Sequence, residues 1–534
     1  MTHKNLRTIL FSLLVLGFVY YAIIYIQATS ILIDGKVYYI LFDDAMISMR
    51  YAYNLAHGLG LVWNAGERAE GITNPLWTGI MALVHLLPIG LNQTGLVIQV
   101  IGASLLTFNL FLVKKITEHF TDDLFVMLAA VALTAFYAPL LSFGLLGMEV
   151  SLLVLMLSAV IWLALKSENR FNISIYILLA ISTLVRFDMA VPYLVIFAVL
   201  FFTQKENRKQ HLIWGLGLLV LSLGGQTVAR YLYYGALLPN TYYLKVEGWP
   251  YKLRILRGLY ALVQFAYYSN WALILLPFTI FLFQRNWKTT LLALVFIGQV
   301  AYSVYVGGDA WENHGGANRY IVIAMPIFFI TFAWSAAELL KRAAHQFTTL
   351  ENKNRIFEIG WRGIFILLFV FSLLNFNALI GEWKSIERWN FSRRPDYVAG
   401  SDRNLQIALS INNVTLPGAS VAVIGAGTIP YLLPDRYAID ILGKADPYIA
   451  HQNVRTPMSI VDVPSMRPGH MKWDYAYTFG QLKPDVIVSI WEGTNAEAAP
   501  YLEKDYVYAV IGEGIKVYLL KDSPNVLWDR VKIK

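Results

Sequence analysis

Long apolar runs follow one another along most of this 534-residue chain. A helix needs roughly 20 apolar residues to cross about 30 Å of hydrocarbon, and runs of this kind recur from residue 9 to residue 381. The pattern predicts a polytopic α-helical membrane protein with about eleven transmembrane helices. The expected crossings are residues 9–29, 95–113, 124–141, 148–165, 172–186, 189–203, 212–230, 271–286, 290–306, 321–340 and 362–381.

The hydrophobic pattern changes in the last part of the chain. There the sequence is mixed and polar, and short stretches such as residues 420–425 and 485–490 alternate as strands do. We therefore expect two parts. A membrane module should cover residues 1–391, and a soluble α/β domain should cover residues 392–534.

Basic residues gather in short loops between the apolar runs. Such loops face the cytoplasm in multi-pass proteins, so we expect a cytoplasmic N-terminus and an extracytoplasmic C-terminal domain, in a bacterial inner (plasma) membrane. The net charge of +8 then reflects topology and gives no support to nucleic-acid binding. The basic loops are residues 114–115, 166–170, 205–211, 285–288 and 341–362.

One apolar stretch does not fit as a crossing. Residues 75–90 are short and bounded by proline, and a crossing there would place Lys114 and Lys115 outside. We expect this stretch to lie at the outer surface or to re-enter the membrane against protein. Residues 34–94 then form one long outer loop.

Composition supports a membrane protein. Charged residues make up 15% of the chain, against roughly 25% in soluble domains, and the mean hydropathy is +0.52. There is no cysteine, which excludes disulfides, thiolate metal sites and a cysteine nucleophile. Basic residues precede the first apolar run without a small-residue cleavage site, so that run is expected to be an uncleaved helix.

Polar residues collect in the predicted outer loops. Charge at helix ends is costly unless it is paired, solvated or functional, so this convergence suggests a site. The adjacent pair Asp43 and Asp44 has no basic neighbour and would repel if simply packed. Ordinary alternatives remain: the pair can be a solvated surface feature, and Arg186 and Arg319 can pair with nearby aspartates or extend toward headgroups.

These residues resemble a known family. The first outer loop carries FDDAMISMRYA at residues 42–52, GLGLVWN at 58–64 and EGITNPLW at 70–77, and is similar to that of GT-C glycosyltransferases, above all the mycobacterial terminal β-(1→2)-arabinofuranosyltransferase group. Phe187 stands where relatives often have proline, and Lys444 and Ala445 interrupt a usually apolar segment, differences that we expect to bear on the substrate. Further matching pieces are residues 147–149, 184–188, 235–245, 307–309, 319, 440–447 and 468–472.

The resemblance implies an enzyme that takes a sugar, best matched as arabinofuranose, from a polyprenyl-phosphate donor at the outer face. It implies a catalytic Asp43 or Asp44. Because guanidinium groups bind phosphate oxygens bidentately, Arg186 and Arg319, with Lys245, are the candidates for the donor phosphate. Neighbouring side chains point in different directions, so only one aspartate should touch the sugar.

A wider set of residues is a candidate for the sugar or the acceptor. Within the soluble domain, Asp440 can instead satisfy backbone donors in a turn and His470 can lie on a loop surface. Asp122 and Asp123 repeat the acidic pair, but the topology makes them cytoplasmic, where a helix N-cap is the better interpretation. The candidate sugar- or acceptor-binding residues are Arg50, Glu70, Asn74, Glu149, Asp188, Asp309, His314, Asp446, His470 and Lys472.

Two other classes of protein share part of the pattern. A lipid or polysaccharide transporter would also have many helices, but its charges would lie at the membrane midplane rather than at the outer helix ends. A sensor or scaffold would not need so many helices as an anchor. The expected partners are the bilayer, a polyprenyl-phosphate sugar, and a glycan, lipid-linked saccharide or protein acceptor. No cofactor or metal is expected, although a divalent ion is not excluded.

Overall fold

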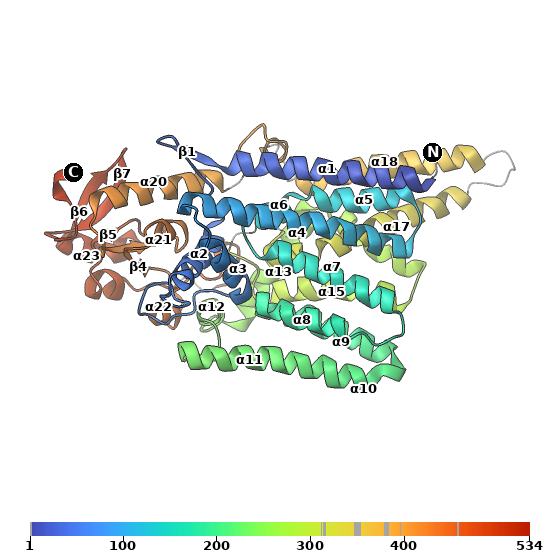
Figure 1. Ribbon diagram of the computed structural model, residues 1–534, viewed down its shortest axis with the longest axis horizontal. Helices are drawn as coiled ribbons and strands as arrows, with labels where there is room; N and C mark the ends of the chain where they lie inside the picture. Colours follow the sequence, from blue (N-terminus) through green and yellow to red (C-terminus); the bar gives the residue numbers. More distant parts are fainter. Residues whose placement is uncertain are drawn as a thin grey trace.

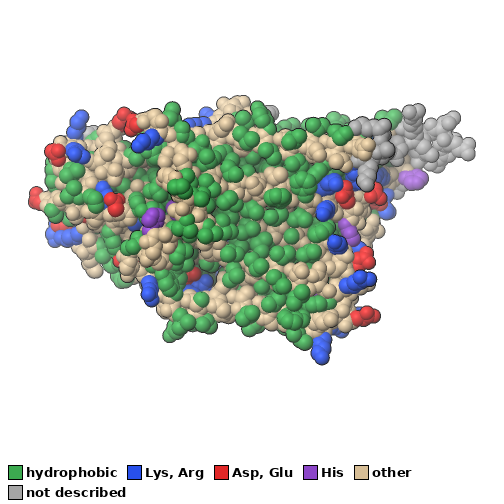
Figure 2. Space-filling view, viewed as in Figure 1, with side chains coloured by type: hydrophobic (Ala, Val, Ile, Leu, Met, Phe, Trp, Pro, Cys, Tyr) green, Lys and Arg blue, Asp and Glu red, His purple; other side chains and the backbone are tan. Residues whose placement is uncertain are grey.

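The computed structural model describes residues 3–310, 312, 317–346, 354–378, 384–395, 397–455 and 459–533. A long helical bundle carries a mixed α/β domain at one end, and the N-terminus lies at the opposite end of the bundle (Figure 1). Hydrophobic side chains cover the middle of the visible face, while charged side chains gather toward both ends (Figure 2). The predicted fold class, a polytopic α-helical membrane protein with a C-terminal α/β domain, is confirmed.

Most of the expected crossings coincide with helices. Among the described residues, six helices are long and apolar enough to cross a membrane, or up to eight if two bent pairs each form one span. The crossings expected at 172–186 and 189–203 are shorter apolar helices, so the count of eleven remains a prediction. The bundle helices are α1 (His3–Thr29), α4 (Leu91–Phe120), α5 (Leu124–Ala135), α6 (Ala138–Leu145), α7 (Val150–Ser167), α8 (Ile173–Val185), α9 (Ala190–Thr203), α10 (Arg208–Gln210), α11 (Gly217–Tyr234), α13 (Tyr251–Tyr268), α14 (Trp271–Leu275), α15 (Trp287–Tyr305), α17 (Met325–Gln346) and α18 (Asn354–Asn377).

Helix α13 was not among the expected elements, because basic residues interrupt its apolar pattern. The structure buries two of these residues, Arg254 and Arg257, and Arg257 lies 3.5 Å from the carboxylate of Glu312. After α13 the chain bends by 103° into residues 271–282. The crossing expected at 271–286 is therefore the second arm of a bent pair.

The segment at residues 75–90 forms a short helix, α3 (Pro75–His85), of 11 residues. Proline at its first position suits a helix start, since its missing N–H would have no partner there. At 1.5 Å per residue it is too short to cross the hydrocarbon. It lies beside α2 (Asp43–Ala56) at the domain end of the bundle (Figure 1).

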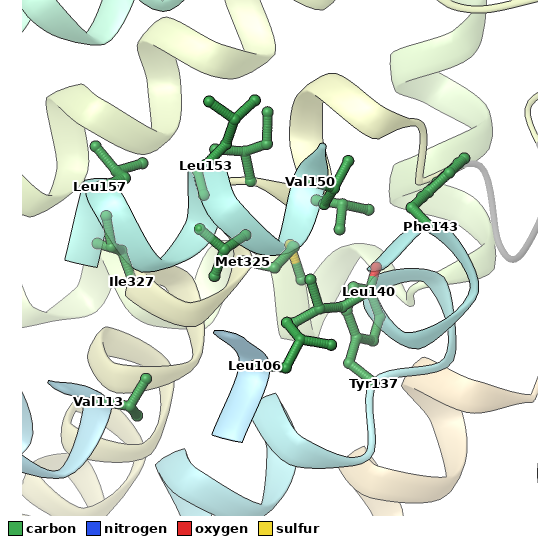
Figure 3. Packing of buried hydrophobic residues seen from close by; sticks show 14 of the residues in the cluster. Leu106, Val113, Tyr137, Leu140, Phe143, Val150, Leu153, Leu157, Met325 and Ile327 are labelled. Atoms are coloured by element: carbon green, nitrogen blue, oxygen red, sulfur yellow. The ribbon is translucent and has the colours of Figure 1, made fainter. Parts of the chain in front are cut away.

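The bundle core is close-packed around α4, α6, α7 and α17 (Figure 3). Gly102 on α4 allows this approach, because a Cβ there would lie 2.4 Å from the carbonyl oxygen of Gly144. The core also holds the segment that leads into α2. The amide of Phe42 donates to the carbonyl of Leu146 over 2.9 Å, and Leu41 packs against Gly147, whose φ is +85°. The start of α2 is thereby fixed to the bundle.

The C-terminal domain contains a six-stranded sheet in the order β4-β3-β5-β7-β6-β8. Strands β4, β3 and β5 are parallel, and the others pair antiparallel. The alternation at residues 420–425 and 485–490 correctly predicted two of these strands. The strands are β3 (Ser420–Val423), β4 (Tyr437–Asp440), β5 (Val486–Ile487), β6 (Tyr506–Ile511), β7 (Ile515–Leu520) and β8 (Lys532–Ile533); a separate hairpin joins β1 (Ile31–Ile33) and β2 (Lys36–Tyr38).

The domain core extends into the segment at residues 34–94 of the membrane module. Ile47 and Tyr51 of α2, with Trp63 and Ile72 of the following loop, belong to the same buried cluster as the strands. The domain is thus docked on α2 through shared hydrophobic packing. The domain helices are α20 (Val398–Val414), α21 (Thr428–Leu432), α22 (Pro447–Ala450) and α23 (Asn495–Asp505), and α19 (Lys384–Trp389) precedes them.

Candidate active site

Helix α2 presents two faces to two different surroundings. Residues three or four apart share one face of a helix, and Asp44, Ile47 and Ser48 all line one cavity. Seven residues return to nearly the same angle at 3.6 residues per turn, and Asp43 and Arg50 both contact the C-terminal domain. The two neighbouring aspartates therefore have different environments.

Asp43 fixes the domain to the start of α2. Its Oδ1 accepts a hydrogen bond of 2.9 Å from the amide of Thr428, the first residue of α21. Gly427 makes this approach possible, because a Cβ there would lie 1.9 Å from the Asp43 carbonyl oxygen. Residues 425–427 thus contact α2 closely.

Asp44 lies among cations from distant parts of the chain. Its Oδ2 accepts from Arg319 Nη2 over 2.9 Å, and its Oδ1 lies 3.3 Å from Lys444 Nζ. Arg319 also binds Asp309 bidentately, through Nε over 2.6 Å and Nη2 over 2.9 Å. The first-loop aspartate and the helix-end arginine predicted to share a cavity are therefore in direct contact.

Lys245 supplies a further positive charge. It ends α12 (Asn240–Lys245) and lines the cavity, and among the described residues it forms no hydrogen bond or ion pair. Burial, together with the charge of Arg319, lowers its pKa to about 8. Gly469 has a φ of +84°, and a Cβ there would lie 3.0 Å from Lys245 Cε. The 468–470 loop thus packs against the stem of Lys245.

The cavity lies between the bundle end and the C-terminal domain and has a volume of about 60 Å³. A phosphate group fits such a space, whereas a complete lipid-linked sugar has to extend beyond it. The lining residues are Asp44, Ile47, Ser48, Gly71, Ile72, Thr73, Asn74, Met148, Glu149, Thr241, Lys245, Arg319 and Lys444.

The charges in this cluster shift one another's pKa. Burial alone would raise the pKa of Asp44, but Lys444, Arg319 and Lys245 outweigh burial and hold it well below its usual range. For Asp309, burial is likewise outweighed, mainly by Arg319, which lowers the pKa to about 2. Both aspartates are therefore ionised at neutral pH. Three cations, Arg319, Lys444 and Lys245, then surround these two carboxylates.

Arg186 lies in a second ion-pair group. It donates to Glu149 over 2.7 Å and to Asp188 through Nε over 2.9 Å and Nη2 over 2.7 Å. Glu149 also accepts from Asn74 over 2.8 Å, and both of these residues line the cavity. Arg186 is not among the lining residues in the described part of the chain. It acts here by orienting Glu149, so a direct contact with phosphate remains a prediction.

Arg50 and Glu70, both candidates for acceptor binding, hold other parts of the chain. Arg50 donates to the backbone carbonyls of Trp63, Pro430, Leu433 and Arg436 and to the Asn64 side chain. Glu70 forms a buried ion pair with Arg230 of α11. These contacts join α2 to the domain and the outer loop to α11.

Of the three described candidates in the C-terminal domain, two bind backbone groups and one lies beside the cation cluster. The Asp446 side chain caps α22 by accepting from the amide of Ile449, and Lys472 Nζ donates to the carbonyls of Tyr243 and Ala450. His470 is buried, and burial together with the charge of Lys444 lowers its pKa to about 3. His470 is therefore neutral beside the cation cluster. His314 lies outside the described residues.

Lys444 is the site residue that the sequence did not reveal. Asp440 accepts from the amides of Leu442, Gly443 and Ala445, as expected for an aspartate that stabilises a turn. Asn240 Nδ2 donates to the carbonyls of Gly443 and Lys444. A signal was present in the sequence, because a lysine within the largely apolar run of residues 441–445 needs an anionic partner once buried.

Two further expectations concern other acidic residues. Asp123 caps α5 by accepting from the amides of Phe125 and Val126, so the N-cap interpretation is confirmed. Among the described residues, no group of three or more His, Cys, Asp or Glu side chains is placed to hold a metal ion. The expectation that the reaction needs no metal stays a prediction.

Comparisons with known proteins identify the fold. The profile of a family described as a domain of unknown function, DUF8728, matches residues 390–522, and the search of curated sequences finds no match. ArnT from Cupriavidus metallidurans, in a structure bound to undecaprenyl phosphate, superposes with a TM-score of 0.55 and 11% identity over 97% of this chain and 98% of that chain. The oligosaccharyltransferase AglB from Archaeoglobus fulgidus, in complex with an inhibitory peptide and a dolichol-phosphate, has a TM-score of 0.53 and 12% identity over 99% of this chain and 76% of that chain. The chain thus adopts the fold of the GT-C glycosyltransferases.

Proposed function

We propose that the protein transfers a sugar from a polyprenyl-phosphate donor to an acceptor in the cell envelope. The observation that carries this proposal is the contact of Asp44 with Arg319 and Lys444 at a cavity that Lys245 also lines. Three cations suit a phosphate, and a carboxylate beside them suits a reacting hydroxyl. The similar structures of ArnT and AglB contain undecaprenyl phosphate and dolichol-phosphate, respectively, which supports a prenyl phosphate as ligand.

In the proposed reaction, the bond between the anomeric carbon and a phosphate oxygen breaks, and its electron pair leaves with the phosphate. The acceptor hydroxyl oxygen forms the new bond to the anomeric carbon. Its proton passes to Asp44 if the anomer inverts. If the anomer is retained, either a carboxylate attacks first or the acceptor enters on the face that the phosphate leaves.

The departing phosphate gains negative charge, which Lys245, Lys444 and Arg319 stabilise. Without donor, the same cations hold the pKa of Asp44 far too low for an effective base. A bound phosphate would offset part of their field and raise that pKa, since opposite charges screen one another. In this proposal, donor binding prepares Asp44 to accept a proton.

The sidedness of the reaction follows from the basic loops. Arg7 and Lys114 both pair with Glu118, which lies near the C-terminal end of α4, and the N-terminus lies at the bundle end opposite the C-terminal domain (Figure 1). The positive-inside rule assigns that end to the cytoplasm. We infer that the cavity faces the extracytoplasmic side of a bacterial inner membrane.

We propose arabinofuranose as the sugar, on the strength of the first-loop resemblance, and a glycan, a lipid-linked saccharide or a protein as the acceptor. The test is to supply the purified protein, in lipid nanodiscs, with radiolabelled prenyl-phosphoryl arabinofuranose and neutral oligosaccharides. Wild-type protein should label an oligosaccharide, and Asp44→Asn should not. If a different prenyl-phosphoryl sugar labels the oligosaccharide, the proposed reaction class stands and only the assignment of the sugar changes.

The alternative of a transporter has a separate readout. Vesicles that contain the protein would move a prenyl-phosphoryl sugar between leaflets without forming a new glycosidic bond. Movement with no transfer to any acceptor, together with full movement by Asp44→Asn, would refute the enzymatic proposal.

A further inference from the structure

A second, larger cavity lies within the C-terminal domain. Its volume is about 590 Å³, far above that of the cavity beside Asp44. Its walls come from α20, from the segments that follow β3 and β5, and from the hairpin between β6 and β7. We call it the domain cleft, and the lining residues used here are Arg403, Trp491, Glu492, Glu513 and Lys516.

The cleft lies where the strand order of the sheet changes direction. Strand β3 pairs with β4 on one side and with β5 on the other, all in parallel. The chain passes from β3 through α21 to β4 and then crosses to β5. Open α/β sheets bind ligands at this switch point, outside the carboxyl ends of the strands. Ile424 and Gly425, directly after β3, and Val488, directly after β5, line the cleft.

The lining chemistry favours an uncharged, hydroxyl-rich ligand. Among the lining residues, two acids, Glu492 and Glu513, match Arg403 and Lys516 in number, and Glu492 also pairs with Arg467 over 3.4 Å. The lining is thus of mixed charge rather than strongly basic. Trp491 is only partly buried and offers an apolar ring among polar groups. Saccharides combine apolar ring faces with hydroxyl groups that pair with charged and amide side chains, and so match this mixed lining.

Two residues that line the cleft, Trp491 and Gly425, contact neighbours of Asp44. The Trp491 ring stacks on His470 with centroids 5.4 Å apart, and His470 lies close enough to Asp44 and Lys444 for their charges to act on it. Gly425 lies against α2, since a Cβ there would be 3.2 Å from Asp43 Oδ2. The cleft wall at Gly425 therefore lies against the Asp43 side of the first turn of α2.

We propose that the domain cleft binds the saccharide part of the acceptor and directs its terminal hydroxyl toward Asp44. This inference rests on the proposed glycosyl transfer. It assigns acceptor recognition to the C-terminal domain and donor recognition to the cavity at the bundle end. Trp491 and Arg403 are its binding residues.

The first test measures binding without donor, with the full-length protein in nanodiscs and a panel of neutral pentose and hexose hexasaccharides. At least one hexasaccharide should bind to wild type, and Trp491→Ala and Arg403→Gln should each weaken that binding by about tenfold or more, equivalent to 1.4 kcal/mol. Lys504→Gln, at an exposed lysine of α23 outside the cleft lining, is the matched control and should bind normally. Trp491→Phe keeps an aromatic ring and should restore most of the affinity.

The second test separates this inference from the proposed function. In transfer assays, the cleft variants should raise the KM for the hexasaccharide and leave the KM for the donor unchanged. Three outcomes would overturn the cleft assignment: equal hexasaccharide affinity in wild type and both cleft variants, an equal loss of affinity in Lys504→Gln, or no binding of any hexasaccharide. In each case, label transfer by wild type would still support glycosyl transfer. Binding at the cleft without transfer to any acceptor would instead refute the proposed function.

Discussion

Lys444 Nζ lies 3.3 Å from Asp44 Oδ1, although 400 positions separate the two residues in the chain. The pair joins the first turn of α2 in the membrane module to a loop of the C-terminal domain. Its lysine side chain is 12% exposed and its aspartate 28%, so water screens the pair only partly. The site therefore depends on both parts of the chain.

The two first-loop aspartates should differ sharply on substitution. Asp44→Asn removes the carboxylate from the cation cluster and should lower kcat by about 100- to 10,000-fold, the usual contribution of a proton-transfer group. Asp43→Asn keeps an oxygen that can accept from Thr428, so its kcat should stay within a few-fold of wild type. Steady-state transfer assays check both values. Equal losses in the two variants would contradict the assignment of Asp44.

Lys444→Gln should weaken donor binding. A hydrogen bond to a charged group contributes about 1.5–3 kcal/mol, so the Kd for a prenyl phosphate should rise about tenfold or more. Isothermal titration with prenyl phosphate measures this. Lys483→Gln, which breaks an exposed ion pair with Asp505 in the same domain, should leave the Kd unchanged; an equal rise in this control would point to a nonspecific charge effect.

Donor affinity should fall as the pH rises through the pKa of Lys245. That pKa is lowered to about 8 by burial and by Arg319, so the ammonium is charged below about pH 8 and neutral above it. The Kd for prenyl phosphate should therefore increase between pH 7 and pH 9. Lys245→Arg keeps its charge over this range and should flatten the profile. An unchanged alkaline rise in that variant would show that another group titrates.

Arg50→Met should affect stability far more than chemistry. The substitution leaves the buried carbonyl of Arg436 without its donor, at a cost of about 1–3 kcal/mol for an unsatisfied group. It also removes one of two donors from the carbonyls of Trp63 and Leu433. Thermal unfolding should begin at a clearly lower temperature, while the KM for the acceptor in the folded fraction stays near that of wild type. A raised acceptor KM with normal thermal stability would instead restore the acceptor-binding role predicted from the sequence.

Gly427→Ala should disturb the docking of the domain on α2. The added Cβ would meet the Asp43 carbonyl oxygen at 1.9 Å, so the backbone has to shift, at a cost of about 1–3 kcal/mol as for other overpacked positions. The melting temperature and kcat should both fall. Gly400→Ala, where the Cβ meets nothing within 4 Å, is the control and should be neutral or slightly stabilising, since alanine favours the helix. A normal melting temperature in Gly427→Ala would show that the contact adjusts freely.

The sequence predicted the fold, and the proximity of Asp44 to Arg319, for a physical reason. Spans of apolar residues and the charges between them record the bilayer directly, so residue order alone indicated that Asp44 and Arg319 belong to one end of the bundle. The spacing of residues in α2 also predicts which side chains share a face, because Asp43 and Arg50 lie seven residues apart. That face contacts the domain.

The ion-pair partner of each charged side chain could not be predicted from the sequence. Arg186 and Arg319 look alike at their helix ends, yet Arg186 is held by Glu149 and Asp188 while Arg319 reaches Asp44. The difference arises from the packing of distant segments, which local spacing does not encode. Helix α13 was missed for a related reason, because Arg257 meets its buried partner Glu312 only in the folded chain.

The Lys444 loop has a consequence for how such chains can be divided or recombined. Asn240 of the membrane module donates hydrogen bonds to two backbone carbonyls of this loop. Asp440 of the domain accepts hydrogen bonds from two of its backbone amides. A fragment that ends before residue 392 would keep Asp44 and Arg319 but lack one cation, and a hybrid that carries a foreign C-terminal part would inherit that part's loop. Exchange of the two halves between related proteins would therefore change donor affinity and acceptor choice together.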